Sequence, residues 1–405
     1  MSSENRFDWG SFGQLLISLL GFLIGLGGAA LLALGALFSL AGATSNGSQQ
    51  LNGVMTLMWS GLVMAALCLP SAVLAVRALM RREPLLRNGK RWLIFASLLL
   101  LLWPLVLVLS RAASGSAMAW LFLPPLLIAV VGIPVLWLTS AARSGLPAES
   151  EQRGWGVASF ALVISPTLIL ILQFLLLLLG AIGFGVWLSG QPDLLNELQS
   201  MARSMTLQSD PNQVLQRLRP YLERPGVLAL GLLFVGGLVP LIEEMLKPLG
   251  VWFLAGRKLT PAGGFSAGVL SGGMFALLES MAYLSSATPD GFITFALART
   301  GTVLLHITTA GLVGWGLGLA LGEKRYLRLA LTYLGAVLLH GAWNTIGILP
   351  ALAEVPALSG QLQGMATASP YVLAALALLM AFILFALNRR LRARPYEAAP
   401  AILGS

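Results

Sequence analysis

Charged residues are scarce in this sequence. Only 10% of its 405 residues are Asp, Glu, Lys or Arg, whereas 57% are hydrophobic. A soluble domain carries roughly 25% charged residues, so this chain has too little polar surface to cover a fold that is exposed to water. The low charge content therefore excludes a soluble globular protein of this length.

Cysteine is almost absent as well. The single cysteine, Cys68, lies in an apolar run, and it excludes an intrachain disulfide and a cysteine-rich metal site. The sequence also has no HExxH pattern and no phosphate-binding P-loop, and its aspartates all lie in predicted loops or termini. Zincin-type metalloproteases and proteases with paired intramembrane aspartates are therefore not expected.

Long apolar runs dominate what is present. Uncharged runs of about 20 residues recur along the chain, and in lipid such runs satisfy their own backbone groups as helices. We therefore predict an all-α, polytopic bundle of transmembrane helices. Ten spans are expected, at 13–42, 52–76, 92–110, 117–141, 156–188, 226–254, 262–287, 293–321, 327–348 and 370–388.

We interpret the net charge of +9 as a consequence of how the chain is oriented across the membrane. Most Lys and Arg residues fall at the termini and in the even-numbered connections between spans. The odd-numbered connections hold only Arg111, Arg203, Arg217, Arg219 and Arg224. This positive-inside pattern predicts that both termini are cytoplasmic. We expect a multi-pass protein of a prokaryotic plasma membrane, with the lipid bilayer as a partner and no nucleic acid.

The longest connection, residues 189–225, carries apolar residues at helical spacing. The first set is Leu194, Leu195, Leu198, Met201 and Met205, and a second set is Val214, Leu215, Leu218 and Leu222. Two short amphipathic helices on the membrane surface would produce this pattern. A plain linker is the alternative.

Spans six to nine contain the ionisable residues that lie within apolar runs. These are Glu243, Glu244, Lys247, Glu279, Arg299, His306 and His340, and they include both histidines of the chain. A charge placed in lipid costs at least about 2.5–3.5 kcal/mol on insertion scales, and such residues are functional candidates. We therefore expect these side chains to converge on one shared polar cavity.

Glu243 and Glu244 occur together in LVPLIEEMLKPLG. Residues four apart share a helix face, so Lys247 is expected to pair with Glu243 while Glu244 points elsewhere. Of two adjacent carboxylates beside one cation, one can stay ionised while the other holds a proton, an arrangement used in acid–base catalysis. An ion pair at the helix end is the alternative interpretation.

Glu279 stands deep in an otherwise uncharged span, with Phe275 and Tyr283 one turn away on the same face. Small residues recur upstream at four-residue spacing, at Gly264, Gly268 and Gly272. This spacing is typical of close contact between transmembrane helices. The span is thus expected to be buried in the bundle, where Glu279 needs a partner. A purely structural carboxylate is the alternative.

The two histidines lie on separate spans. His306 follows Arg299 by two helical turns and shares its face. His340 has Asn344 one turn later, so that an imidazole and an amide donor lie on one face. Such donors suit a developing oxyanion. Histidines that only link helices by hydrogen bonds would give the same pattern.

Taken in order, the motifs Glu243-Glu244-x-x-Lys247, Phe275-x-x-x-Glu279, His306 and His340-x-x-x-Asn344 on four successive spans resemble the PrsW family of intramembrane proteases. These are relatives of the type II CAAX prenyl endopeptidases and of bacteriocin-processing membrane proteins. Where the CAAX branch has a histidine, this sequence has Glu279, which points to PrsW. The resemblance covers about 226–348.

The resemblance implies a glutamate-dependent peptidase that cleaves a membrane-anchored protein substrate. The Glu243-Glu244 pair would then supply the base that activates water, with Glu279 as the PrsW-type carboxylate. His306 would help to bind or polarise that water.

The remaining roles follow from the same resemblance. His340 and Asn344 would hold the carbonyl oxygen, and Lys247 would tune the glutamates. No cofactor is expected. Zinc is an alternative, and its ligands would be Glu279, His306 and His340.

The chain then divides into four expected segments. They are 1–188, a five-helix membrane region of unknown role; 189–225, an extracytoplasmic amphipathic connection; 226–348, a PrsW-like four-helix catalytic core; and 349–405, a final helix with a basic cytoplasmic tail. Two other functions use the same buried cluster. One is a proton- or cation-coupled transporter, and the other is a catalytically silent membrane scaffold.

Overall fold

The computed structural model describes residues 8–41, 47–116, 118–147, 150–204, 216–217, 219–221, 223–252, 259–284 and 291–393. These residues are almost entirely helical, and within them the β-type pairing is an isolated bridge between Leu86 and Ser150. The predicted all-α class is confirmed.

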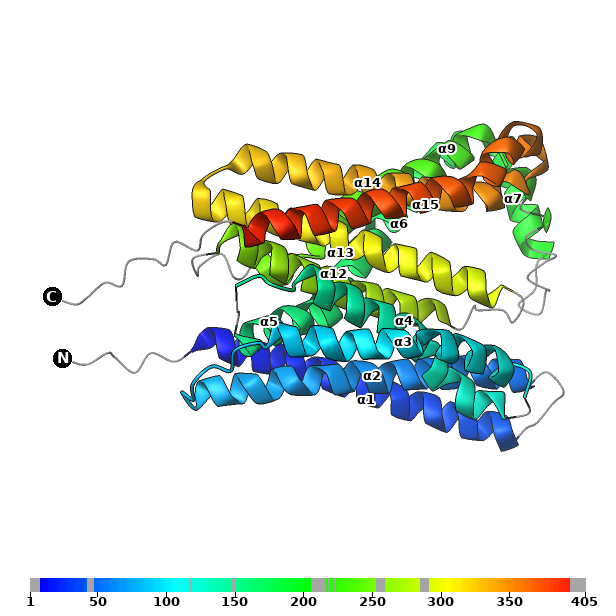
Figure 1. Ribbon diagram of the computed structural model, residues 1–405. Coiled ribbons are helices and arrows are strands. Elements are labelled where there is room, and N and C mark those ends of the chain that lie inside the picture. Colours follow the sequence, from blue (N-terminus) through cyan, green and yellow to red (C-terminus); the bar gives the residue numbers. More distant parts are fainter. Residues whose placement is uncertain are drawn as a thin grey trace. The chain divides into compact units, whose positions relative to one another are not determined.

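The helices follow one another along the chain (Figure 1). They are α1 (Trp9–Ala41), α2 (Gly47–Leu79), α3 (Gly89–Ala113), α4 (Ala119–Ala142), α5 (Glu151–Ser159), the π-helix η1 (Phe160–Ile164), α6 (Ser165–Ser189), α7 (Pro192–Ser204), α9 (Pro225–Leu233), the π-helix η2 (Phe234–Leu238), α10 (Val239–Leu246), α11 (Leu249–Trp252), α12 (Pro261–Tyr283), α13 (Phe292–Glu323), α14 (Tyr326–Ala353) and α15 (Pro356–Arg392).

Ten helical stretches in the described part of the chain are long and apolar enough to cross a membrane, as predicted. Their bounds differ from the predicted ones by a few residues, except at the last span. The prediction began that span at 370, whereas α15 begins at Pro356 and continues through Pro370. A proline within a transmembrane helix is tolerated because neighbouring groups satisfy the backbone that it frees.

The long connection contains one of the two predicted amphipathic helices. Helix α7 covers Pro192–Ser204, and its Leu194, Leu195 and Leu198 are partly buried while Asn196 and Glu197 are exposed. The second predicted helix, at 214–222, lies largely outside the described residues.

The chain forms two compact units. The first comprises residues 1–166, 244–339 and 374–405, and the second comprises 167–243 and 340–373. Helices α6, α10, α14 and α15 each run from one unit into the other.

In the first unit, helices pack in pairs along their lengths (Figure 1): α1 against α2, α3 against α4, and α12 against both α4 and α13. The α12–α13 pair is held close by glycine. A Cβ atom added at Gly264, Gly268 or Gly272 would overlap the main chain of α13. The predicted close contact through small residues is therefore confirmed.

The core of the first unit is apolar and includes Val251, Ala267, Val313, Leu317 and Ala336. Cys68 is also fully buried, as expected for a core cysteine. Many large apolar side chains elsewhere are exposed, such as Leu101 at 77% and Phe382 at 71%. In a membrane protein these surfaces face lipid rather than water.

In the second unit, the π-helix η2 lies directly against α14. A Cβ added at Gly341 would overlap the carbonyl oxygen of Gly236, and one added at Gly236 would overlap the Thr345 hydroxyl. A π-helix shifts the hydrogen-bond pattern by one residue and is frequent at functional sites.

Candidate active site

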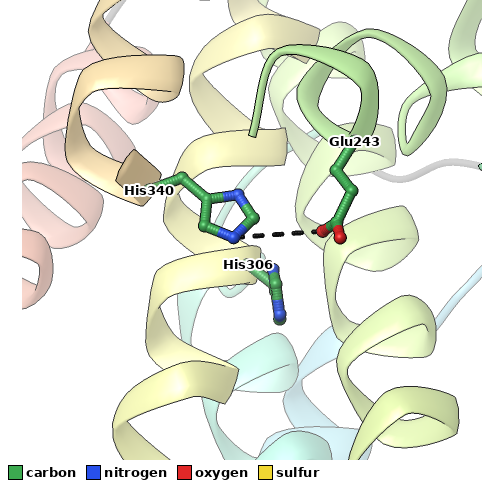
Figure 2. A group of neighbouring side chains, drawn as sticks. All are labelled: Glu243, His306 and His340. Atoms are coloured by element: carbon green, nitrogen blue, oxygen red, sulfur yellow. Dashed lines mark ion pairs between the residues drawn. The ribbon is translucent and has the colours of Figure 1, made fainter. Parts of the chain in front are cut away.

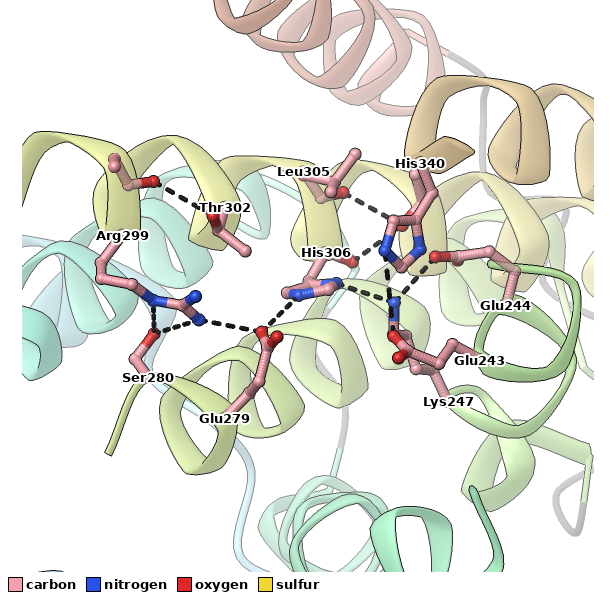
Figure 3. Close-up of polar contacts among 12 residues, drawn as sticks. Glu243, Glu244, Lys247, Glu279, Ser280, Arg299, Thr302, Leu305, His306 and His340 are labelled. Carbon is pink, nitrogen blue, oxygen red and sulfur yellow. Dashed lines mark hydrogen bonds and ion pairs between the residues drawn. The ribbon is translucent and has the colours of Figure 1, made fainter. Parts of the chain in front are cut away.

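A chain of polar contacts joins α10, α12 and α13 inside the first unit (Figure 3). Its members in order are Glu244, Lys247, His306, Glu279 and Arg299. Apart from the contact between Glu244 and Lys247, which lie on the same span, each contact joins residues on separate spans. The structure therefore brings five of the seven expected side chains into contact within this unit, and that they line one polar cavity stays a prediction.

Glu244 and Lys247 form one end of this series of contacts. Lys247 Nζ lies 2.8 Å from Glu244 Oε1, and both side chains are completely buried. The sequence analysis expected Glu244 to point elsewhere and Glu243 to be the partner. That assignment of Glu244 is wrong, because residues three apart share a helix face as well as residues four apart, and Glu244 lies three residues before Lys247.

His306 lies at the centre of the chain and is 1% exposed. Its Nδ1 lies 2.7 Å from Lys247 Nζ, and its Nε2 lies 2.8 Å from Glu279 Oε2. A lysine ammonium can only donate, so Nδ1 accepts and Nε2 carries the proton that is donated to Glu279. Both ring nitrogens are therefore used, and the ring is fixed in one tautomer.

Glu279 and Arg299 form the other end. Arg299 Nη2 donates to the same Oε2 atom of Glu279 at 2.9 Å, and its Nε and Nη2 also contact Ser280 Oγ at 3.2 and 3.0 Å. The Glu279 side chain is 28% exposed, so this end of the chain of contacts is the accessible one. Glu279 has the buried partner that the sequence analysis required.

Two aromatic rings support the cations. Lys247 Nζ lies 4.9 Å from the Phe275 ring centre, and Phe275 in turn packs edge-on against His306 at 5.2 Å. Arg299 Cζ lies 4.9 Å from the Tyr283 ring centre. Cations above aromatic faces gain about 0.5–2 kcal/mol, more when water is excluded.

The second unit holds Glu243, His340 and Asn344. His340 Nε2 and Glu243 Oε2 are 3.9 Å apart, as the dashed line in Figure 2 marks. The Glu243 side chain is 12% exposed and that of His340 is 3% exposed. Asn344 Nδ2 donates to Val235 O in η2 at 3.1 Å, so this amide also fixes α14 to the π-helix.

Several polar partners were not identified from the sequence. Ser271 Oγ donates to Lys247 O at 2.5 Å, and Ser165 Oγ contacts the same oxygen at 3.4 Å. Ser280 holds Arg299, and Gln173 Nε2 contacts Glu243 Oε1 at 3.5 Å. Serine is common in transmembrane helices, where it bonds to its own helix. Nothing in the sequence distinguishes these serines from the others.

Glu279 and His306, which the sequence analysis named together with His340 as alternative metal ligands, do not fit a divalent cation in this arrangement. Lys247 and Arg299 lie at the two ends of the pair, with contacts of 2.7 and 2.9 Å to it. A metal ion placed there would be repelled by two nearby positive charges in a low-dielectric environment. The hydrogen-bond pattern also leaves no unshared lone pair on the His306 ring.

Comparison with known proteins gives one family. The family model described as PrsW family intramembrane metalloprotease matches residues 175–387, which is more than half of the 405 residues. The matched region includes every candidate site residue that the sequence singled out, from Glu243 to Asn344. No curated protein matches the chain, and no solved structure matches it.

Proposed function

This chain belongs to the PrsW family of intramembrane proteases, and on that premise we propose that it is an endopeptidase that hydrolyses membrane-associated proteins with a water molecule activated by glutamate. The observation that best supports this is the difference between two adjacent carboxylates. Glu244 is completely buried and bonded to Lys247, whereas the Glu243 side chain is 12% exposed and lies beside an imidazole.

Glu243 is the general base in this proposal. Its Oε2 lies 3.9 Å from His340 Nε2, which is too long for a direct hydrogen bond and short enough for one water molecule to contact both atoms. A carboxylate within hydrogen-bond reach of a water molecule can take its proton during attack on a carbonyl carbon. Glu244 is bonded to Lys247 and its side chain is completely buried, so we do not assign it this role.

The proposed reaction is hydrolysis of a peptide bond by one water molecule. The water oxygen forms a bond to the carbonyl carbon, and its proton passes to Glu243. The C–N bond then breaks, and the departing amine takes a proton from the protonated carboxyl group. His340 donates to the oxyanion, and so does Asn344, because an amide group has two N–H donors and Val235 O occupies one of them.

The Glu244–Lys247–His306–Glu279–Arg299 chain serves as a rigid support for this chemistry. Glu243 directly precedes Glu244 in α10, so the buried Glu244–Lys247 pair fixes the helix that presents the base. Glu279 carries the most exposed carboxylate of the chain of contacts, and we propose that it holds His306 in its tautomer. Groups that orient a catalytic residue typically contribute 10- to 100-fold.

Family membership favours hydrolysis over the transporter and the scaffold that the sequence left open. A metal-dependent mechanism is the competing version of the same activity, and the family description names a metalloprotease. Glu243 and His340 of the second unit would supply a carboxylate and an imidazole, which are donors that catalytic zinc takes. Both ring nitrogens of His306 in the first unit already contact Lys247 and Glu279, so we favour direct glutamate catalysis.

The test uses the purified full-length protein in detergent with a single-pass membrane protein as substrate. Glu243→Gln should lower the cleavage rate by about 10²–10⁴-fold, the range of general-base catalysis. His340→Ala should lower it as well. Products are identified by mass spectrometry, and thermal unfolding of each variant confirms that it is folded.

The matched control is Glu223→Gln, because Glu223 is a glutamate that lies outside the spans and pairs with Arg219 on the surface. Its cleavage rate should equal that of the unaltered protein. Undiminished cleavage by folded Glu243→Gln would refute Glu243 as the base. Stoichiometric zinc whose removal abolishes cleavage would replace direct glutamate catalysis with the metal-dependent version.

A further inference from the structure

A cavity in the first unit is lined by none of the candidate active-site residues. It has a volume of about 210 Å³ and is formed by α2, α3, α4, α5, α12 and the connection that precedes α3. Part of its wall is fixed by main-chain bonds, because Leu86 bridges to Ser150 and Glu151 N donates to Leu85 O at 2.7 Å. The two connections of the chain that border the cavity are therefore held together by main-chain hydrogen bonds.

Its mouth is charged. Arg87 and Arg143 line it together with a single acidic residue, Glu151. Arg143 is only 6% exposed, and its Nε donates to Ser266 Oγ at 2.9 Å, which fixes the guanidinium in the wall. The lining thus carries one excess positive charge, so a singly charged anion would neutralise it. An arginine guanidinium matches phosphate geometry well.

Its floor is apolar. Leu67, Leu136, Leu270 and Met274 line the cavity along α2, α4 and α12, away from the ends of these helices. Leu67 lies roughly 18 Å along α2 from the end of that helix at Leu79, at 1.5 Å per residue. Polar and apolar groups are therefore separated along the depth of the cavity in the same way as the headgroup and the acyl chain of a lipid.

The position of the cavity also suits a lipid. Arg87 and Glu151 lie at the arginine-rich ends of the spans, which the positive-inside rule assigns to the cytoplasmic surface. Trp92 and Trp155 line the same mouth, and tryptophan is typical of the membrane–water interface. Basic pockets between transmembrane helices on that side bind anionic lipid headgroups.

We propose that this cavity binds one anionic phospholipid, with its phosphate between Arg87 and Arg143 and the start of an acyl chain along Leu136, Leu270 and Met274. The occupant would contact α12, the helix that also carries Phe275 and Glu279 of the candidate active site. The site is independent of the proposed peptidase mechanism, so its test needs no activity assay.

The experiment measures lipid binding to the full-length protein purified in detergent. Phosphatidylglycerol, phosphatidylcholine of the same chain length, and inorganic phosphate are each titrated, and binding is followed by thermal unfolding and native mass spectrometry. Phosphatidylglycerol should raise the melting temperature and bind one to one. Phosphatidylcholine and inorganic phosphate should do neither at the same concentration.

Two variants probe the two ends of the cavity. Arg87→Gln should weaken phosphatidylglycerol binding by at least about tenfold, because it removes a charged hydrogen-bond donor. Met274→Trp should weaken it by filling the floor. Arg91→Gln is the matched control, since Arg91 is an exposed arginine in the same region that does not line the cavity. It should bind like the unaltered protein.

Three results would overturn the proposal. Equal binding of phosphatidylcholine and phosphatidylglycerol would remove the role of charge. An equal loss in Arg91→Gln and Arg87→Gln would indicate general attraction to anionic lipid rather than a site. Stabilisation by inorganic phosphate alone would make the occupant a free anion. Because binding is compared among folded variants, failure of this proposal leaves the proposed peptidase function untouched.

Discussion

At the scale of single residues, the adjacent carboxylates Glu243 and Glu244 occupy different environments. Glu244 is inaccessible and bonded to Lys247, while Glu243 is partly accessible and lies beside His340. A buried ion pair contributes little net stability, but removing one partner leaves an uncompensated charge. We therefore expect Glu244 to act through the position of Lys247, and Glu243 to contact the substrate water.

Lys247→Met tests this assignment of the buried pair. It leaves the Glu244 carboxylate without its cation in a fully buried position, so the free energy of unfolding should fall by about 3–5 kcal/mol. The double variant Glu244→Gln/Lys247→Met should recover most of the loss, because the uncompensated charge is then absent. Thermal unfolding in detergent measures both.

The exposed pair Arg219–Glu223 provides the control, since the Arg219 side chain is 48% exposed. Arg219→Gln should change the free energy of unfolding by less than about 1 kcal/mol. If Lys247→Met were as mild as Arg219→Gln, the pair would not be the buried anchor that its geometry indicates.

At the scale of secondary-structure elements, the contact between α12 and α13 decides whether the site forms. Glu279 lies on α12 and His306 on α13, and their 2.8 Å contact requires the two helices to approach closely. Gly264, Gly268 and Gly272 allow this approach because they have no Cβ atom. The contact between Glu279 and His306 therefore depends on the glycine spacing in α12.

Gly272→Ala tests that requirement. The new Cβ would overlap the carbonyl oxygen of His306, so α12 and α13 must separate. We expect a loss of about 1–3 kcal/mol in the free energy of unfolding and a fall in cleavage of about 100-fold from misplacement of the site. Thermal unfolding and the cleavage assay measure the two effects separately.

Gly335→Ala is the comparison for this prediction. Gly335 lies in α14 with no atom within 4 Å of an added Cβ, so alanine there should be neutral or stabilise the helix by up to about 1 kcal/mol. If Gly272→Ala and Gly335→Ala changed the free energy of unfolding and the cleavage rate equally, the α12–α13 contact would not depend on glycine.

At the scale of the whole molecule, the basic residues predict the orientation in the membrane. The positive-inside rule puts both termini and the connection between α2 and α3 in the cytoplasm, and α7 outside. The sole cysteine, Cys68, is completely buried, so it gives little background in labelling with thiol reagents.

Ser200→Cys tests this orientation, because Ser200 is exposed on α7. A membrane-impermeant maleimide added to intact cells should label it. Glu83→Cys, exposed in the connection between α2 and α3, should be labelled only after the cells are opened. The reverse pattern would invert the topology and place the cavity mouth at Arg87 on the outer surface.

The sequence by itself determined the helical class, the ten spans and the set of ionisable residues within them, because hydropathy and the scarcity of buried charge are properties of single residues and their spacing. Four contacts depended on the tertiary structure. They are the ion pair of Lys247 with Glu244, the contact of Lys247 with His306 that fixes the tautomer of the ring, the hydrogen bond from Arg299 to Ser280, and the hydrogen bond from Asn344 to Val235. Helix periodicity gives the face of a side chain but not its partner on another helix. That partner is set by how closely the helices pack and where each one ends.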